Sequence, residues 1–265
     1  MALRRTTKKK LYRYTVYAVL IAVAIWLAVS TDWARIAELF LNPEVALQMF
    51  PGIITTALVN TLWFTAVAFV GGLLLGVLLA LMKLSSIGPF RWIATVWIEL
   101  FRGLPAILTI FAIAFILPIA LGVPGTKLGG PVVLGLIGLV LVASAYMAET
   151  IRAGIQAVPK GQSEAARSLG MSPAKTTFWI VVPQGFRIII PPLTNEFVLL
   201  LKDTSLLFVA GSFIWSKELT NFARDASTQN ANGTPLIMAA ILYLIVTIPL
   251  TRFSAWLERR MAKQR

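Results

Sequence analysis

Long apolar stretches alternate with short polar ones along the whole chain. A helix needs about 20 apolar residues to cross a bilayer, and uncharged stretches near this length occur at residues 14–31, 45–82, 103–126, 128–148 and 226–251. A sixth stretch, 204–216, is short but becomes long enough when it is extended back through 187–201. The pattern predicts six spans, at residues 12–30, 54–82, 97–121, 131–156, 187–214 and 234–256.

Composition agrees with a membrane location. Hydrophobic residues make up 58% of the chain and charged residues 13%, whereas soluble domains average about 45–50% and about 25%. The chain has no cysteine and no histidine, which removes thiolate chemistry and the commonest metal ligand and general base. We therefore expect an all-α membrane protein with no catalytic site, metal site or cofactor of its own.

Lysine and arginine are concentrated on one side of the predicted topology. Six spans place both termini on the same side, together with the basic loops around 83–91 and 152–187. The opposite side holds only Arg35, Lys127, Lys217 and Arg224. By the positive-inside rule both termini are cytoplasmic. This distribution accounts for the net charge of +13 without nucleic acid as a partner.

Residues 1–52 contain the basic N-terminus, the first span and an outer segment. The basic start and apolar run also resemble a cleavable signal peptide, with Ala28 and Ser30 as the small residues near a cleavage site. The run is long for the core of a signal peptide, so a retained anchor is favoured. Residues 44–52 predict a short amphipathic helix on the outer surface.

The cytoplasmic segment 158–183 is too apolar for a linker. Pro159 can open a helix because its missing N–H is not needed in the first turn, and Ser163–Leu169 favours a helix. Gly170 stands where helices end in a left-handed residue. The adjacent Ala165 and Ala166 would let another surface approach the backbone closely. The segment predicts a short helix that contacts another protein.

This segment resembles the EAA loop of ATP-binding-cassette importer permeases. The matching residues are Glu164-Ala165-Ala166, Gly170, Ile180 and Pro183, with Val182 where the loop usually has leucine. Other stretches resemble the polar amino-acid branch of that family, which imports histidine, glutamate, glutamine, arginine and opines. These stretches are 102–105 (RGLP), 145–154 (AYMAETIRAG), 159–166 (PKGQSEAA), 183–184 (PQ) and 195–206 (NEFVLLLKDTSL).

The resemblance covers roughly residues 53–258 and implies a five-helix type I importer domain there. Residues 1–52 add one helix to it, and 259–265 form a basic tail. The resemblance also implies a coupling helix that docks on a separate cytoplasmic ATPase, formed by Gly161, Glu164, Ala165, Ala166 and Gly170. The chain itself has no Gly-rich nucleotide motif.

The implied partners follow from the same resemblance. They are a dimer of the ATPase, which binds ATP and magnesium, a second permease subunit, and an extracytoplasmic binding protein. The implied cargo is a polar amino acid, and the implied location is the bacterial plasma membrane with its lipid.

Polar residues within the spans are candidates for a substrate path, because charges in the bilayer tend to be paired or to line a path. An amino acid is a zwitterion and needs a donor for its carboxylate and an acceptor for its ammonium group. Both kinds of group occur in one stretch, at Asn195, Glu196, Lys202, Asp203, Thr204 and Ser205. Glu149 in the family-like stretch is a further candidate. We expect Pro191-Pro192 to break the helix before this stretch.

Structural roles are open for several of these residues. Lys202 and Asp203 could form ion pairs with neighbouring spans, and the three-residue spacing could pair Glu149 with Arg152 and Glu99 with Arg102. Residues 90–101 could instead form an interfacial helix, with the span starting at Gly103 and kinked at Pro105. The spacing of glycines 72 and 76 favours close helix packing.

Two other functions are compatible with six membrane spans. A self-sufficient carrier or channel would use Glu196, Lys202 and Asp203 as ion or proton sites, and a membrane scaffold would transport nothing. The importer is favoured over the carrier because a carrier has no need of the alanine-rich coupling helix, whereas the scaffold would use its cytoplasmic loop to dock some other partner. The residues leave open which amino acid is carried and whether the second permease is identical or related.

Overall fold

The computed structural model describes residues 5–211 and 216–262, and within them it contains helices and turns but no strand. The α-helices in chain order are α1 (Arg5–Ser30), α2 (Trp33–Phe40), α3 (Pro43–Gln48), α4 (Val59–Leu84), α5 (Gly88–Gly103), α6 (Ala106–Phe111), α7 (Leu117–Ala120), α8 (Gly130–Gln156), α9 (Lys160–Ser168), α10 (Pro173–Thr176), α11 (Val182–Asp203), α12 (Leu219–Asn230) and α13 (Thr234–Ala262). Wider π-helical turns form η1 (Ile53–Leu58), η2 (Ala112–Ile116) and η4 (Thr177–Val181), and 3-10 turns form η3 (Gly125–Leu128) and η5 (Thr204–Ala210). The all-α prediction is confirmed.

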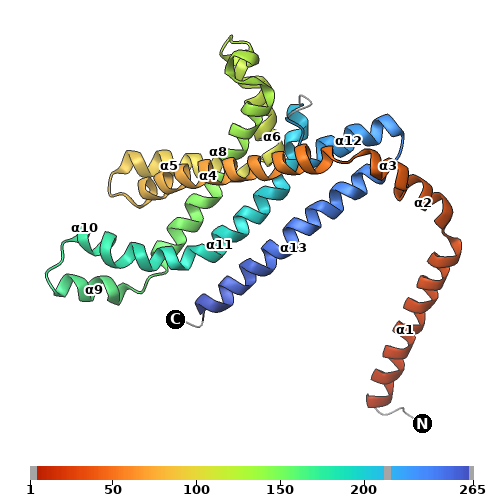
Figure 1. Ribbon diagram of the computed structural model, residues 1–265. Helices are drawn as coiled ribbons and strands as arrows, with labels where there is room; N and C mark the ends of the chain where they lie inside the picture. Colours follow the sequence, from red (N-terminus) through yellow and green to blue (C-terminus); the bar gives the residue numbers. More distant parts are fainter. Residues whose placement is uncertain (1–4, 212–215, 263–265) are drawn as a thin grey trace.

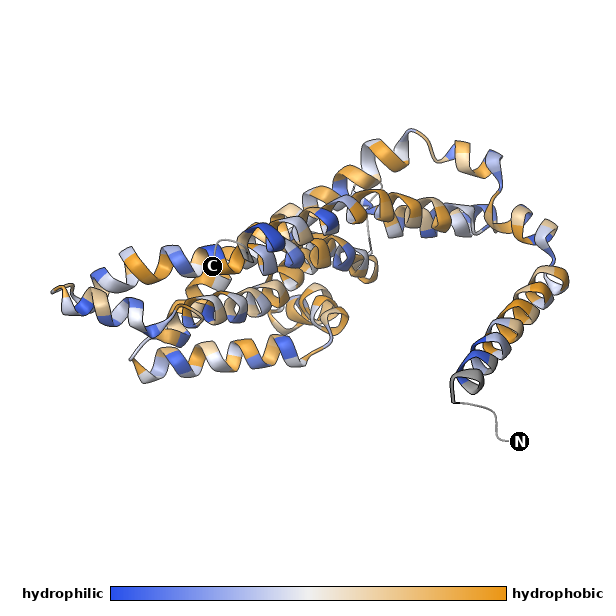
Figure 2. Ribbon diagram, turned by 90° about the horizontal axis from the view of Figure 1, so that it is seen from below, coloured by the Kyte–Doolittle hydropathy of each residue, from blue (hydrophilic) through white to orange (hydrophobic). Residues whose placement is uncertain are grey.

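Four helical stretches are long and apolar enough to cross a membrane. They are Tyr12–Ser30, Ile53–Leu84, Gly130–Gln156 and Thr234–Met261, and they agree with the first, second, fourth and sixth predicted spans. Figure 2 shows hydrophobic positions along the helices, with a hydrophilic end of α1 beside the N-terminus. The many exposed large hydrophobic side chains fit a surface that contacts lipid.

The third predicted span, 97–121, is wrong at its start. The chain bends by 108° between Gly88–Gly103 and Ala106–Ala120. The bend lies at Leu104-Pro105, where proline disfavours a helical conformation in the preceding residue. Two separate helices, one ending at Gly103 and one starting after Pro105, therefore describe this region better than one straight span.

The fifth predicted span, 187–214, falls on α11 and η5 as far as Ala210, and residues 212–214 lie outside the described part of the chain. Among the described residues this stretch is not one of the helices long and apolar enough to cross a membrane, so its crossing stays a prediction. The helix does not break at Pro191-Pro192, so that prediction is wrong: α11 continues through both prolines. Packing holds the helix in place, because a Cβ on Gly154 of α8 would meet Ile189 of α11 at 2.0 Å. Neighbouring helices allow proline within a membrane helix in this way.

The centre of the fold is the contact between α4 and α8. A Cβ on Gly72 would lie 2.7 Å from the Ala143 Cβ, and one on Gly76 would lie 2.9 Å from the Met147 Cβ. The two helices approach this closely because glycine has no side chain at these positions. The predicted packing role of the glycine pair is confirmed.

The N-terminal helix α1 stands apart from this centre (Figure 1), and its membrane-spanning window is 0% buried. The outer segment that follows is longer than predicted, with α2 before α3. Hydrogen bonds connect it to the rest of the fold, from Gly233 N to Leu39 O at 2.7 Å and from Asn42 N to Thr234 Oγ1 at 2.9 Å. Met49, just after α3, also packs in an apolar cluster with Leu219 and Ala239. Figure 1 shows α9 and α10 at one end of the bundle and α3 and α12 at the other.

Candidate functional site

The short helix predicted within residues 158–183 is present as α9. Pro159 precedes its first residue, and Gly170 follows its end with a φ of +84°. The last turn is closed by a hydrogen bond from Met171 N to Ala166 O at 3.2 Å. This pattern is the left-handed helix ending that glycine favours, so the local signals in the sequence were sufficient to predict α9.

The surface of α9 is suited to contact with another protein. Four of the predicted coupling residues are exposed, namely Gly161, Glu164, Ala165 and Gly170. The fifth, Ala166, is buried in the hairpin that α9 forms with α10 and η4. Leu169, at the tip, is 85% exposed. Sequence reasoning missed Leu169, although it is the one large apolar residue between Pro159 and Gly170. Single exposed apolar residues are common on protein surfaces, so Leu169 is a candidate contact because it shares the exposed surface of α9 with Glu164 and Ala165.

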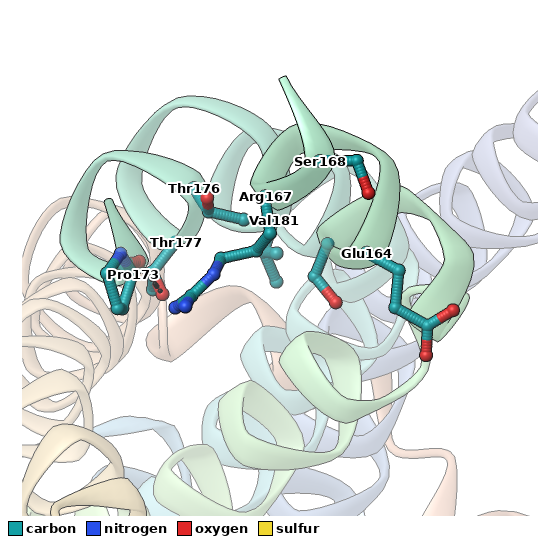
Figure 3. A pocket seen from close by; sticks show the side chains of 8 residues that line it. Glu164, Arg167, Ser168, Pro173, Thr176, Thr177 and Val181 are labelled. Carbon is teal, nitrogen blue, oxygen red and sulfur yellow. Dashed lines mark hydrogen bonds between the residues drawn. The ribbon is translucent and has the colours of Figure 1, made fainter. Parts of the chain in front are cut away.

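A groove of 540 Å³ lies between α9 and the helical turns that follow it. Figure 3 shows the Arg167 side chain extending toward Pro173 and Thr177, while the Glu164 carboxylate points away from them. The groove is lined by Ser163, Glu164, Arg167, Ser168, Pro173, Thr176, Thr177 and Val181. Of the predicted coupling residues, only Glu164 lines it.

Glu149 lies near the end of α8 that leads into α9. Its carboxylate forms ion pairs with Lys83 of α4 and with Arg152, the latter at 2.7 Å. Arg152 also donates to the Gln156 side chain at 2.5 Å. The predicted pairing of Glu149 with Arg152 is confirmed, and its role in a substrate path stays a prediction.

The polar residues of α11 and η5 face different surroundings. Asn195 is exposed and lines a groove of 370 Å³ between α11 and α13. Lys202 is exposed, Glu196, Asp203 and Ser205 are half-buried, and Thr204 is buried. Thr204 donates to Leu201 O at 2.7 Å.

Ion pairs between this stretch and neighbouring spans do not form within the described residues. There the ion pairs are Lys83–Glu149, Glu149–Arg152 and Lys217–Asp225, so Lys202 and Asp203 form no ion pair with another described span.

Arg102 is a residue whose position the sequence did not predict. It does not pair with Glu99 among the described contacts. Its guanidinium group lies over the Tyr146 ring at 5.5 Å and interacts electrostatically with Glu196. The 108° bend after Gly103 carries Arg102 to this position, and the only local signal for it was Pro105.

Several known proteins are similar to this chain in sequence and in fold. A family described as "Binding-protein-dependent transport system inner membrane component" matches residues 72–263. The probable glutamine ABC transporter permease protein GlnM of Bacillus subtilis (strain 168) is 37% identical over 206 residues, or 77% of this chain and 91% of that protein. The arginine transport system permease protein ArtQ of the same strain is 35% identical over 208 residues, or 78% and 92%.

Solved structures of ABC transporters are similar to this chain in fold. A chain in "Crystal structure of an amino acid ABC transporter with histidines" is 36% identical, covers 81% of this chain and 96% of its own length, and superimposes with a TM-score of 0.71. A chain of the MetNI methionine ABC transporter in an inward-facing conformation is 16% identical with a TM-score of 0.62, covers 76% of this chain and 93% of its own length, and shares the fold.

The family match spans most of the chain, and relatives more than 30% identical cover over three quarters of it. The same assignment explains the apolar helices. The chain is a bacterial multi-pass membrane protein that belongs to the binding-protein-dependent transport system inner membrane component family, in its amino-acid ABC transporter permease branch.

Proposed function

We propose that this chain is the transmembrane subunit of an ATP-driven importer that moves a polar amino acid into the bacterial cytoplasm by alternating access. The observation that supports this most is α9, a short helix outside the bundle with an exposed face and the exposed Leu169 at its tip. A separate ATPase dimer, binding ATP and magnesium, would move α9. Because α9 follows α8 directly, the motion would pass to the bundle.

The proposed topology has six spans with both termini cytoplasmic. It consists of the four long apolar helices, the segment from α6 to α7, and α11 with η5. Basic residues gather at the α9 end of the bundle, in agreement with the positive-inside rule. The type I domain then occupies 53–258, the anchor and outer segment 1–52, the coupling loop 158–183 and the basic tail 259–265.

The proposed substrate path follows α11 and η5, through Asn195, Glu196, Lys202, Asp203, Thr204 and Ser205. Glu149, also proposed for the path, is already neutralised by Lys83 and Arg152. The remaining charges are the carboxylates of Glu196 and Asp203 and the cations of Lys202 and Arg102. This balance fits a zwitterion and does not demand a charged side chain on the cargo.

The remaining partners in this proposal are a second permease subunit and an extracytoplasmic binding protein. Their support is that the relatives are amino-acid ABC transporter permeases of a binding-protein-dependent family. The second permease would cover the exposed polar face of α11. Nucleic acid has no place in the proposal.

A purification experiment tests the function. The chain, tagged at its C-terminus, is extracted gently from membranes, and its ATP hydrolysis is measured with a candidate binding protein and a panel of amino acids. We expect an ATPase to co-purify and one amino acid to stimulate hydrolysis. A chain that purifies and transports alone would instead indicate a carrier, and one that transports nothing with its partners would indicate a scaffold.

Gly170 offers a matched variant for this experiment. The change Gly170→Asp places a charged side chain at a φ of +84°, but no atom of this chain lies within 4 Å of the added Cβ. The membrane domain should therefore stay folded while uptake is lost. Normal uptake by a correctly inserted Gly170→Asp protein would contradict the coupling role of α9.

A further inference from the structure

The carboxyl group of Glu218 is buried between helices that lie far apart in the sequence. Glu218 is 1% exposed, and among the described residues it is the one charged residue that is fully buried. It precedes α12, at the end of the bundle opposite α9 (Figure 1). A buried carboxylate is costly unless it is fully hydrogen-bonded, so its partners indicate what the residue does.

The first set of partners is the start of α12 itself. Glu218 Oε1 accepts from Asn221 N at 2.6 Å, and Oε2 accepts from Thr220 N at 2.7 Å. The side chain thereby caps two backbone N–H groups in the first turn, which have no partner inside the helix.

The second set of partners ties this turn to other helices. Tyr243 of α13 donates its hydroxyl to Glu218 Oε2 at 3.1 Å and lies 3.2 Å from the Thr220 hydroxyl. Leu219 N donates to Thr61 Oγ1 of α4 at 3.0 Å. The beginning of α12 is thus fixed on two spans at once, and Glu218 is the group that both the helix start and α13 share.

The Tyr243 side chain also interacts with Thr204, which belongs to the proposed substrate path. Immediately after Thr204, η5 and α12 form the sides of a groove of 450 Å³. Arg224 of α12 lies over the Phe208 ring of η5 at 5.4 Å, and both line the groove together with Asn221 and Asp225. Asp225 is already ion-paired with Lys217, so the charge left in the groove is the Arg224 guanidinium, a donor for the carboxylate of an amino acid.

We propose that Glu218 is a positioning residue for the outer opening of the transport path: it fixes α12 to α13 and thereby keeps the groove between η5 and α12 in shape for an incoming amino acid. The claim that this groove serves transport rests on the proposed function. The claim that Glu218 fixes the position of α12 does not depend on it.

A cysteine reporter tests the position of α12 directly, because the chain contains no other cysteine. Ala223 of α12 is 0% exposed, and Gln229 on the same helix is exposed. Ala223→Cys and Gln229→Cys are introduced separately into the full chain, and labelling in membranes is measured with a membrane-impermeant maleimide. We expect Gln229→Cys to react and Ala223→Cys to stay protected.

The reporter is then combined with changes at the contact. Glu218→Ala should expose Ala223→Cys and raise its labelling at least fivefold. Tyr243→Phe keeps the cap of Glu218 on α12 but removes its link to α13, so it should raise the labelling of Ala223→Cys by a smaller factor. This variant also provides a result if the Glu218→Ala protein fails to insert into the membrane. Glu218→Gln keeps one acceptor oxygen and should restore most of the protection. Glu44→Gln changes an exposed carboxylate in the first turn of α3 and should have no effect.

Uptake of labelled glutamine, arginine, glutamate and cystine completes the test. We expect Glu218→Ala to lower the initial rate at least tenfold, Glu218→Gln to recover it in part, and Glu44→Gln to match the unmodified chain. Continued protection of Ala223→Cys in both Glu218→Ala and Tyr243→Phe would overturn the positioning role. Strong labelling with a normal uptake rate would overturn its importance for transport. If the unmodified chain takes up none of the amino acids, the proposed function fails while the labelling result still decides the position of α12.

Discussion

Lys83 of α4 and Glu149 of α8 form an ion pair close to the point where α8 leads into α9. Both side chains are largely shielded from solvent, at 22% and 15% exposure. The pair joins the two helices that pack most closely in the bundle, near the end of each. Any force that α9 exerts on α8 would therefore reach α4 as well.

Removing Lys83 should loosen this connection without unfolding the protein. In Lys83→Met the carboxylate keeps Arg152 as a partner, so we expect the free energy of unfolding to fall by only about 1 kcal/mol. Amino-acid uptake per ATP hydrolysed should fall more clearly, because α4 no longer follows α8. Thermal unfolding in detergent and the ratio of uptake to hydrolysis measure the two effects. Lys127→Met is the control, since exposed Lys127 forms no ion pair with a described residue. Equal losses of uptake per ATP hydrolysed in both variants would contradict the role of Lys83.

The close contact of α4 with α8 makes Gly76 sensitive to a single added carbon. In Gly76→Ala the new Cβ would lie 2.9 Å from the Met147 Cβ and 3.1 Å from Ser144 O. Overpacking of this kind costs about 1–3 kcal/mol. We expect a lower midpoint of thermal unfolding for Gly76→Ala and no loss for Gly88→Ala, where nothing lies within 4 Å. An unchanged midpoint for Gly76→Ala would show that the helices separate easily.

The features that the sequence predicted well are those with local signals. The start of α9 follows from Pro159 and its end from Gly170, and the apolar stretches themselves mark four of the spans. The likeness of residues 159–166 to the EAA loop then connected this helix to a function. None of these inferences needed to know which helices are neighbours.

The features that were missed depend on contacts between distant residues. Local rules predict a break at Pro191-Pro192, but α11 continues because α8 packs against it at Gly154 and Ile189. Likewise the hydrogen bond from Tyr243 to Glu218 joins two residues on different helices. A hydropathy pattern contains no information about such partners.

Leu169 should be important for binding the ATPase and unimportant for the fold. Its side chain is 85% exposed at the tip of the α9 hairpin, so Leu169→Ser removes little packing within the chain. Fully burying an exposed leucine side chain is worth about 1.5–3 kcal/mol, and losing about 1 kcal/mol of this at the interface corresponds to about a fivefold loss of affinity. We expect less ATPase to co-purify with Leu169→Ser at an unchanged midpoint of thermal unfolding.

The control for Leu169→Ser is Leu47→Ser. Leu47 lies on α3 at the other end of the bundle and is 72% exposed, so it should leave the recovery of ATPase unchanged. Equal recovery with both variants would argue against α9 as the docking element.

Glu218 should make the stability of the protein depend on pH. Burial raises the pKa of its carboxyl group from 4.5 to about 7, although the N–H groups of Thr220 and Asn221 and the Tyr243 hydroxyl oppose the shift. Because the folded state holds the proton more tightly than the unfolded state, this group adds most stability below pH 4.5 and loses that contribution as the pH rises to about 7. The full change in the free energy of unfolding is on the order of 3 kcal/mol.

The thermal midpoint should therefore fall between pH 5 and pH 8 in the unmodified protein and fall less in Glu218→Gln, which cannot ionise. Glu44→Gln, which removes an exposed carboxylate on α3, is measured as the comparison. Parallel curves for the unmodified protein and Glu218→Gln would mean that this buried carboxyl group does not titrate in that range.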